Sequence, residues 1–306
     1  MAKVVVIGGA NADIKGRAGS AIIAMTSNPG EVTVSPGGVG RNIAENLARL
    51  GVETSLSCFV GDDANGRLIR DACGGAGVDT EMIETAAAPT GVYLAVLDEA
   101  GEMTVAINDM RAAEQMTVDY LQARAQRFAA ADMLVADCNI PLSCLAWLCH
   151  FAKEIHVPLL IEPISVAKGR KILAFTRAPP AFAVTPNLQQ LEALTAETNT
   201  MTAIAKLHRL GFANIVVHAG REGAFVSDGV DAPRRIPPFP IDTIADVTGA
   251  GDAAVAGLIL GLVTGHNLSA AAKLGQAAAA IKLGSRNSVA GGMTRASVSA
   301  LAGITI

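Results

Sequence analysis

Residues 36–61 read PGGVGRNIAENLARLGVETSLSCFVG, a glycine-rich loop followed by a helix pattern and then a strand pattern. Ile43, Leu47 and Leu50 recur at helical spacing, and Gly51 suits the position just after a helix end. The run TSLSCFVG that follows has the length and the bounding glycine of a strand. A loop that leads into a helix and then a strand is the repeating unit of α/β proteins.

The same alternation extends along the chain on both sides of this segment. Helix-period segments separate further short strand patterns, which read KVVVIGG (3–9), DMLVADCN (132–139), VPLLIEP (157–163), AFAVTPN (181–187) and NIVVHAG (214–220). This order predicts an α/β fold with a doubly wound, mostly parallel sheet flanked by helices, within a single domain over residues 1–306.

Two segments do not follow this rhythm. Residues 14–36 and 89–109 contain strand patterns without intervening helices, and the second includes a hairpin signal around residues 99–101. We interpret the two segments as a small, discontinuous β lid inserted into the main domain.

The amino-acid composition argues against several classes of function. The 306 residues are 51% hydrophobic, and the net charge of −4 argues against broad binding to nucleic acid or to a membrane surface. The five cysteines form no C-x-x-C pair, which favours free, buried thiols in a reducing cytosol. The longest apolar helical run, residues 253–263, is shorter than the roughly 18 residues of a membrane-spanning helix. We therefore expect a cytoplasmic protein.

The motif DVTGAGD, residues 246–252, opens that apolar run, in which Val255 and every third or fourth residue after it form an apolar stripe. A helix N-terminus offers free N–H groups to an anion, and Gly249 and Gly251 allow close approach to the backbone. A carboxylate beside an anion is useful if it accepts a proton from a nucleophile that attacks phosphorus, so Asp252 is a candidate base. The alternative is a turn into a buried helix, with Asp252 complementing the helix dipole.

Short polar side chains follow the first strand, where ligands bind in parallel sheets. Asn11 and Asp13 suit a polyol, whose hydroxyls need both donors and acceptors, and Asn42 and Asn139 supply more amides. Each of these residue types, taken alone, is more often a cap or turn residue.

Nucleotide fingerprints of other classes are missing from the sequence. The loop at residues 37–40 is followed by Ile43 where a dinucleotide fingerprint needs glycine, and no G-x-x-x-x-G-K-[ST] occurs. An NAD-dependent oxidoreductase and a non-catalytic sugar-binding protein remain as alternatives from other classes.

PGGVGRN (36–42) and DVTGAGDAAVAG (246–257) resemble, in order and spacing, the two signatures of the PfkB, or ribokinase-like, carbohydrate kinases. The resemblance covers essentially the whole chain, including TPN (185–187) and AGREG (219–223). It implies a ribokinase-like fold and an ATP- and Mg²⁺-dependent kinase of a small sugar or nucleoside. It also implies a homodimer formed through the β lid.

The resemblance assigns roles to individual residues. It implies Asp252 as the catalytic base, and an anion hole made by the backbone of Gly249, Ala250 and Gly251. Sugar contacts are implied at Asn11, Asp13, Gly38, Asn42 and Asn139. The ATP region is implied at His218, Gly220 and Gly223, with Asn187 opening an N-x-x-E motif linked to magnesium and phosphate. Asp246 and Thr248 match positions that help hold a monovalent cation such as K⁺.

This sequence departs from the family pattern at three places. Gln190 stands where the N-x-x-E motif has glutamate, with Glu192 two residues further on, and His218 stands where relatives carry Ser or Thr. Val39 follows Gly38 where ribokinases have lysine, which weakens the case for free ribose.

The wider likeness within the family is to members that phosphorylate pseudouridine. It rests on SNPG (27–30), GEMTVAINDM (101–110) and LVADCNI (134–140), in addition to the loop and helix after Ser35. Asn108 or Asp109, at the end of a lid strand, would then lie over the substrate, although a plain hairpin end explains them equally well. Ribose and adenosine are the alternative substrates.

Overall fold

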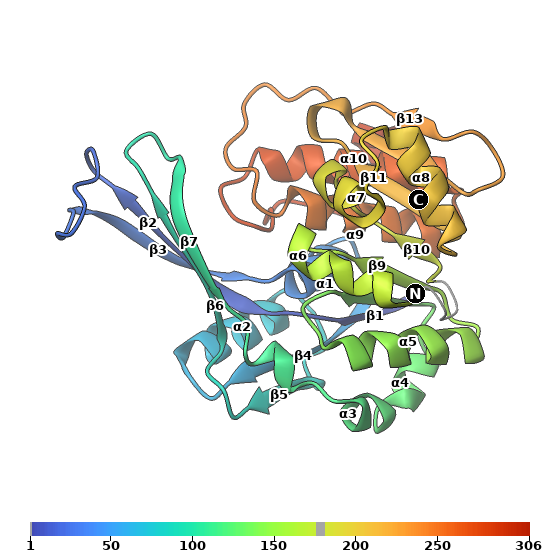
Figure 1. Cartoon of the computed structure of the whole chain (residues 1–306), viewed down its shortest axis with the longest axis horizontal. Coiled ribbons are helices and arrows are strands. Elements are labelled where there is room, and N and C mark those ends of the chain that lie inside the picture. Colours follow the sequence, from blue (N-terminus) through green and yellow to red (C-terminus); the bar gives the residue numbers. More distant parts are fainter. Residues whose placement is uncertain (1, 176–180) are drawn as a thin grey trace.

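A computed structural model describes residues 2–175 and 181–306 and contains two sheets (Figure 1). The larger has nine strands in the order β13-β12-β11-β10-β9-β8-β1-β4-β5. Its strands run parallel from β5 to β11, and β12 and β13 are antiparallel. The bounds are β1 Lys3–Ile7, β4 Glu53–Gly61, β5 Ile83–Ala86, β8 Met133–Asp137, β9 Leu159–Glu162, β10 Ala183–Val184, β11 Asn214–His218, β12 Ala224–Ser227 and β13 Arg234–Ile236. The predicted doubly wound, mostly parallel sheet is confirmed.

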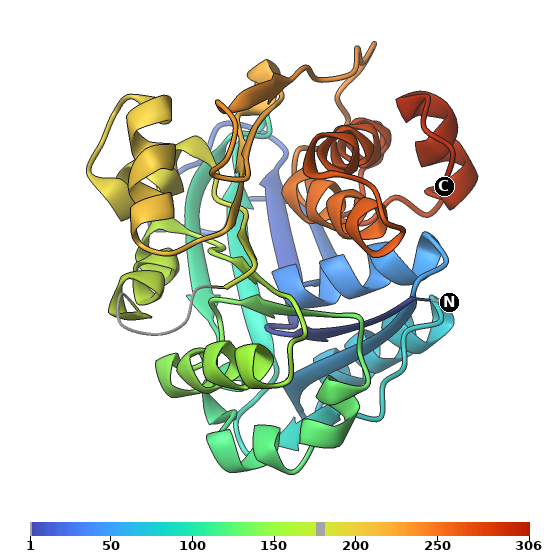
Figure 2. The same cartoon turned by 90° about the vertical axis from the view of Figure 1, so that its right-hand side faces the viewer.

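Helices cover both faces of this sheet (Figure 2). Along β1 the side chains alternate, so that Val4 and Val6 belong to one buried core, and Val5 and Ile7 to the other. The helices are α1 Val39–Arg49, α2 Ala64–Gly75, α3 Val118–Gln122, α4 Ala125–Ala129, α5 Leu142–Glu154, α6 Val166–Gly169, α7 Leu188–Thr195, α8 Thr200–Arg209, α9 Ala250–Val263, α10 Leu268–Leu283 and α11 Arg295–Ala302. No helix in the described ranges is long and apolar enough to cross a membrane.

The small sheet projects from the body as an arm (Figure 1). Its order is β3-β2-β6-β7, with β2 Asn11–Ala18, β3 Gly30–Gly37, β6 Gly91–Leu97 and β7 Met103–Asp109. The central pair, β2 and β6, is parallel, and the outer pairs are antiparallel. Strand β2 begins at Asn11, so Asn11 and Asp13 lie on the arm itself and not in the loop that precedes it.

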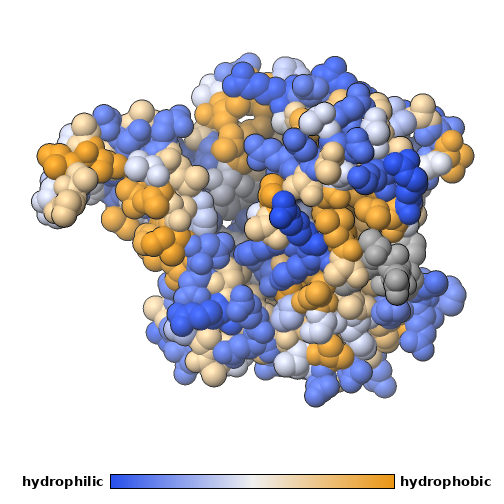
Figure 3. Space-filling view, viewed as in Figure 1, coloured by the Kyte–Doolittle hydropathy of each residue, from blue (hydrophilic) through white to orange (hydrophobic). Residues whose placement is uncertain are grey.

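The two faces of the small sheet differ in chemistry. Val34, Ile14, Leu94 and Ile107 are paired in register across the four strands and share one face. Large apolar residues of this sheet are exposed, and Figure 3 shows hydrophobic side chains gathered on the arm. The alternate positions of β2, including Asp13 and Lys15, point to the opposite face.

Helices α9 and α10 form a tightly packed antiparallel hairpin. A Cβ on Gly257 would lie 2.7 Å from the Leu274 carbonyl oxygen, and one on Gly275 would lie 2.5 Å from the Ala254 carbonyl oxygen. The predicted core-facing residues Val255, Leu258 and Ile259 lie in the core, and the rest of residues 253–261 of α9 is buried as well. The hairpin brings the C-terminus of α10 back to the N-terminus of α9, where the DVTGAGD motif lies.

Candidate active site

Asp137, at the end of β8, organises the centre of the site although the sequence analysis did not single it out. Its side chain is fully buried, and it accepts hydrogen bonds from the backbone N–H groups of Gly9 (2.8 Å), Gly40 (2.9 Å) and Asn139 (2.8 Å). Burial raises its pKa, and these bonds oppose the shift. Asp137 thus joins β8 to the loop after β1 and to the first turn of α1. A carboxylate that ends an otherwise apolar strand was the available signal.

The glycines of the PGGVG loop allow this close approach. Gly38 has φ of 97°, and a Cβ there would lie 2.6 Å from the Gly9 carbonyl oxygen. A Cβ on Gly37 would lie 2.3 Å from a carboxylate oxygen of Asp13. The loop therefore packs closely against β2 and the end of β1. As expected, α1 begins directly after this loop.

The polar residues predicted to bind a polyol are brought together here. Asn11 donates to Asp13 through Nδ2–Oδ1 at 2.6 Å, and both side chains are buried. Asn139 is also buried, and its Oδ1 accepts from Lys168 Nζ at 2.6 Å. Burial raises the pKa of Asp13, which the Asn11 bond opposes. Paired amides and a carboxylate offer the donors and acceptors that adjacent hydroxyls require.

Asp252 lies in the first turn of α9, and Asn42 of α1 donates to it. Burial raises the pKa of Asp252 to about 7, the Asn42 bond opposes the shift, and the neighbouring charges of Asp137 and Asp13 add to it. A carboxyl that titrates near neutrality is suited to general base catalysis.

Arg41 determines how the Asn42 amide is oriented. Its guanidinium is buried, pairs with Glu45, and donates to Asn42 Oδ1 and to the Pro36 carbonyl oxygen (2.9 Å). With Oδ1 engaged by Arg41, the Nδ2 donor of Asn42 faces Asp252. The sequence analysis missed both Arg41 and Glu45.

The anion site is predicted at the start of α9. Gly249 is left-handed with φ of 82°, and Gly251 is exposed, with open space where a Cβ would lie. The Ala250 N–H donates back to the Val247 carbonyl oxygen at 3.2 Å, so it is already engaged in the turn. The N–H of Gly251 belongs to the first helical turn, where backbone donors lack intrahelical partners.

A cavity of about 510 Å³ opens beside this turn. It brings together His218, Gly220 and Gly223 with Ala250 and Gly251, and apolar walls are supplied by Phe239, Ile241, Ile244, Ala279, Ala280 and Leu283. The predicted ATP region and the predicted anion site therefore share one cavity. An apolar pocket that leads to a helix N-terminus can hold a planar base at one end and phosphates at the other.

His218 faces this cavity as a neutral ring. Burial lowers its pKa to about 4, and its Nε2 has no hydrogen-bond partner in the part of the chain that the structure describes. A buried, unpaired nitrogen next to a cavity is available to a ligand.

Asn187 and Gln190 form a capping box at the start of α7. Gln190 N donates to Asn187 Oδ1 and Asn187 N donates to Gln190 Oε1, each at 2.9 Å. The amide oxygen of Gln190 accepts the backbone bond that a glutamate carboxylate accepts in a capping box. The side chain of Asn187 is engaged by its own helix, so its role toward magnesium or phosphate stays a prediction.

Glu162, at the end of β9, is a buried acid that the sequence analysis missed. Burial raises its pKa to about 8, the Thr185 hydroxyl bond opposes the shift, and the charge of Asp252 adds to it. Within residues 2–175 and 181–306, no cluster of three or more metal-ligating side chains is found. Glu162 is thus a further acidic group near the candidate base, in addition to Asp137 and Asp13.

Asp246 and Thr248, the residues matched to a monovalent cation site, face an ammonium group. Lys15 Nζ lies 2.9 Å from Asp246 Oδ2 and 3.2 Å from Thr248 Oγ1. The Thr248 N–H donates to Asp246 Oδ1 at 2.7 Å.

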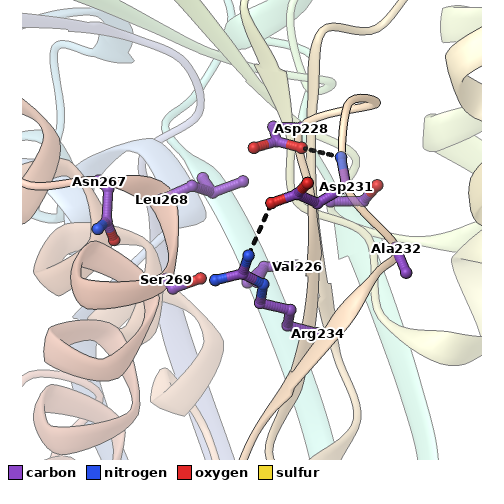
Figure 4. Close-up of a pocket in the computed structure, with 9 residues that line it drawn as sticks. Val226, Asp228, Asp231, Ala232, Arg234, Asn267, Leu268 and Ser269 are labelled. Carbon is purple, nitrogen blue, oxygen red and sulfur yellow. Dashed lines mark hydrogen bonds and ion pairs between the residues drawn. The ribbon is translucent and has the colours of Figure 1, made fainter.

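A second pocket, between β12–β13 and the start of α10, contains none of these residues (Figure 4). Its charged groups satisfy one another, because Arg234 pairs with Asp231 at 2.7 Å and Asp228 accepts from the N–H groups of Val230 and Asp231. We assign it no part in the site.

Solved structures of similar fold define the class. The structure is similar to that of a carbohydrate kinase from Agrobacterium tumefaciens (TM-score 0.87, 30% identity, 100% of this chain and 98% of that chain covered). It is also similar to Arabidopsis thaliana ribokinase complexed with ribose and ATP (TM-score 0.86, 25% identity, 100% of both chains). The class is a phosphotransferase that acts on an alcohol group.

The family follows from the sequence comparison. Residues 1–294 match the pfkB family of carbohydrate kinases, and the chain belongs to this family. The pseudouridine kinase of Escherichia coli K12 is 34% identical over 291 residues, covering 92% of this chain and 90% of that protein. A ribokinase of Haemophilus influenzae is 28% identical, covering 84% of each chain. The oxidoreductase and non-catalytic alternatives are therefore set aside.

Proposed function

We propose that this chain transfers the γ-phosphoryl group of ATP to the 5′-hydroxyl of pseudouridine. The observation that carries the kinase chemistry is the placement of Asp252, with a pKa of about 7, one residue from the exposed amide of Gly251. The choice of pseudouridine is supported by the 34% identity to the Escherichia coli enzyme and by the segments at 27–30, 101–110 and 134–140.

In this mechanism each part of the site has one task. Asn11, Asp13, Gly38, Asn42 and Asn139 hold the ribose hydroxyls. Asp252 accepts the proton of the 5′-hydroxyl as its oxygen attacks the γ-phosphorus, and ADP leaves with the electrons of the broken P–O bond. The amides at the start of α9 stabilise the negative charge on the transferred group. His218, Gly220, Gly223 and Asn187 contact the nucleotide.

Magnesium fits this site as an ion held mainly by the ATP phosphates. Glu162 is the side chain that we assign to it, because a buried carboxyl with a pKa of about 8 ionises readily only beside a positive charge. When bound, Mg²⁺ neutralises phosphate charge and draws electron density from the γ-phosphorus.

An ADP-release assay over a substrate panel tests the proposal. Pseudouridine carries an extra ring N–H compared with uridine, and a pocket that pairs this donor leaves a buried acceptor unsatisfied when uridine binds. That loss is worth about 1–3 kcal/mol, or roughly tenfold to a hundredfold in kcat/KM. Free ribose cannot fill the base pocket at all. We expect pseudouridine first, then uridine, then ribose.

The panel separates the substrate from the reaction class. If ribose or adenosine has the highest kcat/KM, pseudouridine is wrong and a different sugar or nucleoside kinase activity takes its place. If no member of the panel releases ADP, the site does not act as proposed.

We also propose a cytoplasmic homodimer in which two small sheets meet. The support is the exposed apolar face of the sheet, which includes Val32, Val34, Val105 and Ile107. The five free and buried cysteines support a reducing compartment.

A further inference from the structure

A buried lysine lies beside the turn that carries the anion site. Lys282, near the C-terminus of α10, is fully buried, and its Nζ donates to the backbone carbonyl oxygens of Asp246 (2.7 Å) and Ser285 (3.2 Å). A buried ammonium is costly unless oxygen acceptors surround it, and the C-terminal end of a helix adds favourable negative potential. Lys282 is therefore a fixed positive charge with a defined set of oxygen ligands.

Lys15 of β2 approaches the same turn from the small sheet. Its contacts, described above, are the side-chain oxygens of Asp246 and Thr248, whereas Lys282 takes the main-chain oxygen of Asp246. The Ala245 N–H also donates to the Leu283 carbonyl oxygen at 2.8 Å. Residues 245–248 are thus held from two sides immediately before Gly249.

These contacts do not fit a separate monovalent cation at Asp246 and Thr248. A cation bound there would need oxygen atoms as ligands, and N–H donors from Lys15, Lys282 and the Thr248 backbone already point at those oxygens. A cation at that place would also lie beside two ammonium groups, which repel it.

We infer that Lys282 acts as a built-in cation: its ammonium orders residues 246–248 and so positions the anion site, and the protein needs no K⁺. The positioning role rests on the proposed function, but the absence of K⁺ binding does not. Lys282 is a positioning residue, because it contacts the turn and not the reacting atoms.

The test compares K⁺ with choline at constant ionic strength, using the full chain. We expect the wild-type protein to show the same Tm and the same kcat in both salts. A specifically bound cation would raise Tm as its concentration rises. A K⁺-dependent rise in wild-type Tm, or K⁺ activation of the wild type, would overturn the inference.

Lys282→Ala and Lys282→Met supply the second arm. In choline, both variants should lose about tenfold or more in kcat, with a much smaller change in the KM of the nucleoside, because the anion site is displaced and the sugar contacts remain. K⁺ or NH₄⁺ should raise Tm and restore part of kcat in Lys282→Ala, which leaves room for an ion, and not in Lys282→Met. Lys273→Met, an exposed position on the same helix, is the matched control and should resemble the wild type.

The experiment separates failure of the Lys282 inference from failure of the proposed kinase activity. Undiminished kcat in both Lys282 variants overturns the positioning role. If no substrate releases ADP, the proposed function fails, and the wild-type Tm comparison still decides whether K⁺ binds. If the variants do not fold, the wild-type Tm comparison again decides whether K⁺ binds.

Discussion

Asn42 and Asp252, 210 residues apart in the chain, are joined by a hydrogen bond from Nδ2 to Oδ2 of 2.6 Å. The bond links the first turn of α1 to the first turn of α9. It ties the helix that follows the glycine-rich loop to the candidate base and fixes one oxygen of the Asp252 carboxylate. The first three predictions follow from this pair.

Asp252→Asn keeps the shape of the side chain and removes the proton acceptor. We expect kcat to fall by about 10² to 10⁴, the usual scale for a positioned base, with little change in the affinity for ATP or nucleoside. Steady-state kinetics together with nucleotide binding by calorimetry measure this. Turnover close to that of the wild type would remove Asp252 from the role of base.

The same variant has a predicted effect on stability. Burial raises the pKa of Asp252 from 3.8 to about 7, so the carboxyl ionises less readily in the folded state than in the unfolded chain. The free energy of unfolding therefore falls as pH rises through this interval. Asparagine has no such cost. Urea unfolding should therefore show Asp252→Asn to be more stable than the wild type at pH 8, by a margin that shrinks at pH 5.

Asn42→Ala should move the pH dependence of the reaction. In the wild type, kcat/KM should fall below about pH 7 as Asp252 becomes protonated. The lost hydrogen bond stabilised the ionised form, so the acid limb should move up by about one pH unit. The plateau of kcat/KM at high pH should stay below that of the wild type, because Asn42 is also a proposed sugar contact. Asn199→Ala, which removes a helix cap from α8, is a control that should leave the limb in place. An unmoved limb in Asn42→Ala would show that Asp252 is not the titrating group.

Gly251→Val tests the anion site. The glycine has open space around its Cβ position, so the fold should tolerate the change, whereas the new side chain obstructs phosphate at the backbone. We expect kcat to fall by about 10² or more with Asp252 intact. Gly74→Val, an exposed glycine of α2 with equally open surroundings, is the matched control. Gly249→Val is a poorer test, because its Cβ would lie 2.1 Å from the Ser288 carbonyl oxygen and distort the turn.

Val34→Asp tests the proposed homodimer. A carboxylate on the exposed apolar face of the small sheet would be buried without a partner in a dimer, at a cost of several kcal/mol. Light scattering should give the wild type about twice the 31.2 kDa of one chain, and the variant the mass of one. Thr33→Asp, on the opposite face of the same strand, should stay dimeric. A monomeric wild type contradicts the proposal directly.

Local sequence patterns determined the elements of this protein and the chemistry at their ends. Apolar residues at spacings of two and of three to four select strands and helices, and glycine at a helix start exposes backbone donors. The succession of strands and helices and the glycine loop could therefore be read before any contact was known, and Asp252 could be named as a candidate base. The capping box of Asn187 and Gln190 is equally local, because it spans only four residues.

Only the tertiary structure decided which distant residues meet. The Asn42–Asp252 bond, the backbone bonds from Gly9 and Gly40 to Asp137 and the two lysines on Asp246 all join segments that are far apart in the chain. The sequence around a polar residue is the same whether its side chain faces water or a buried partner. Lys282 lies in a largely apolar helix, and nothing in the sequence indicates which oxygen atoms it contacts. Its position follows from the close packing of α9 on α10, which depends on the glycine contacts between the two helices.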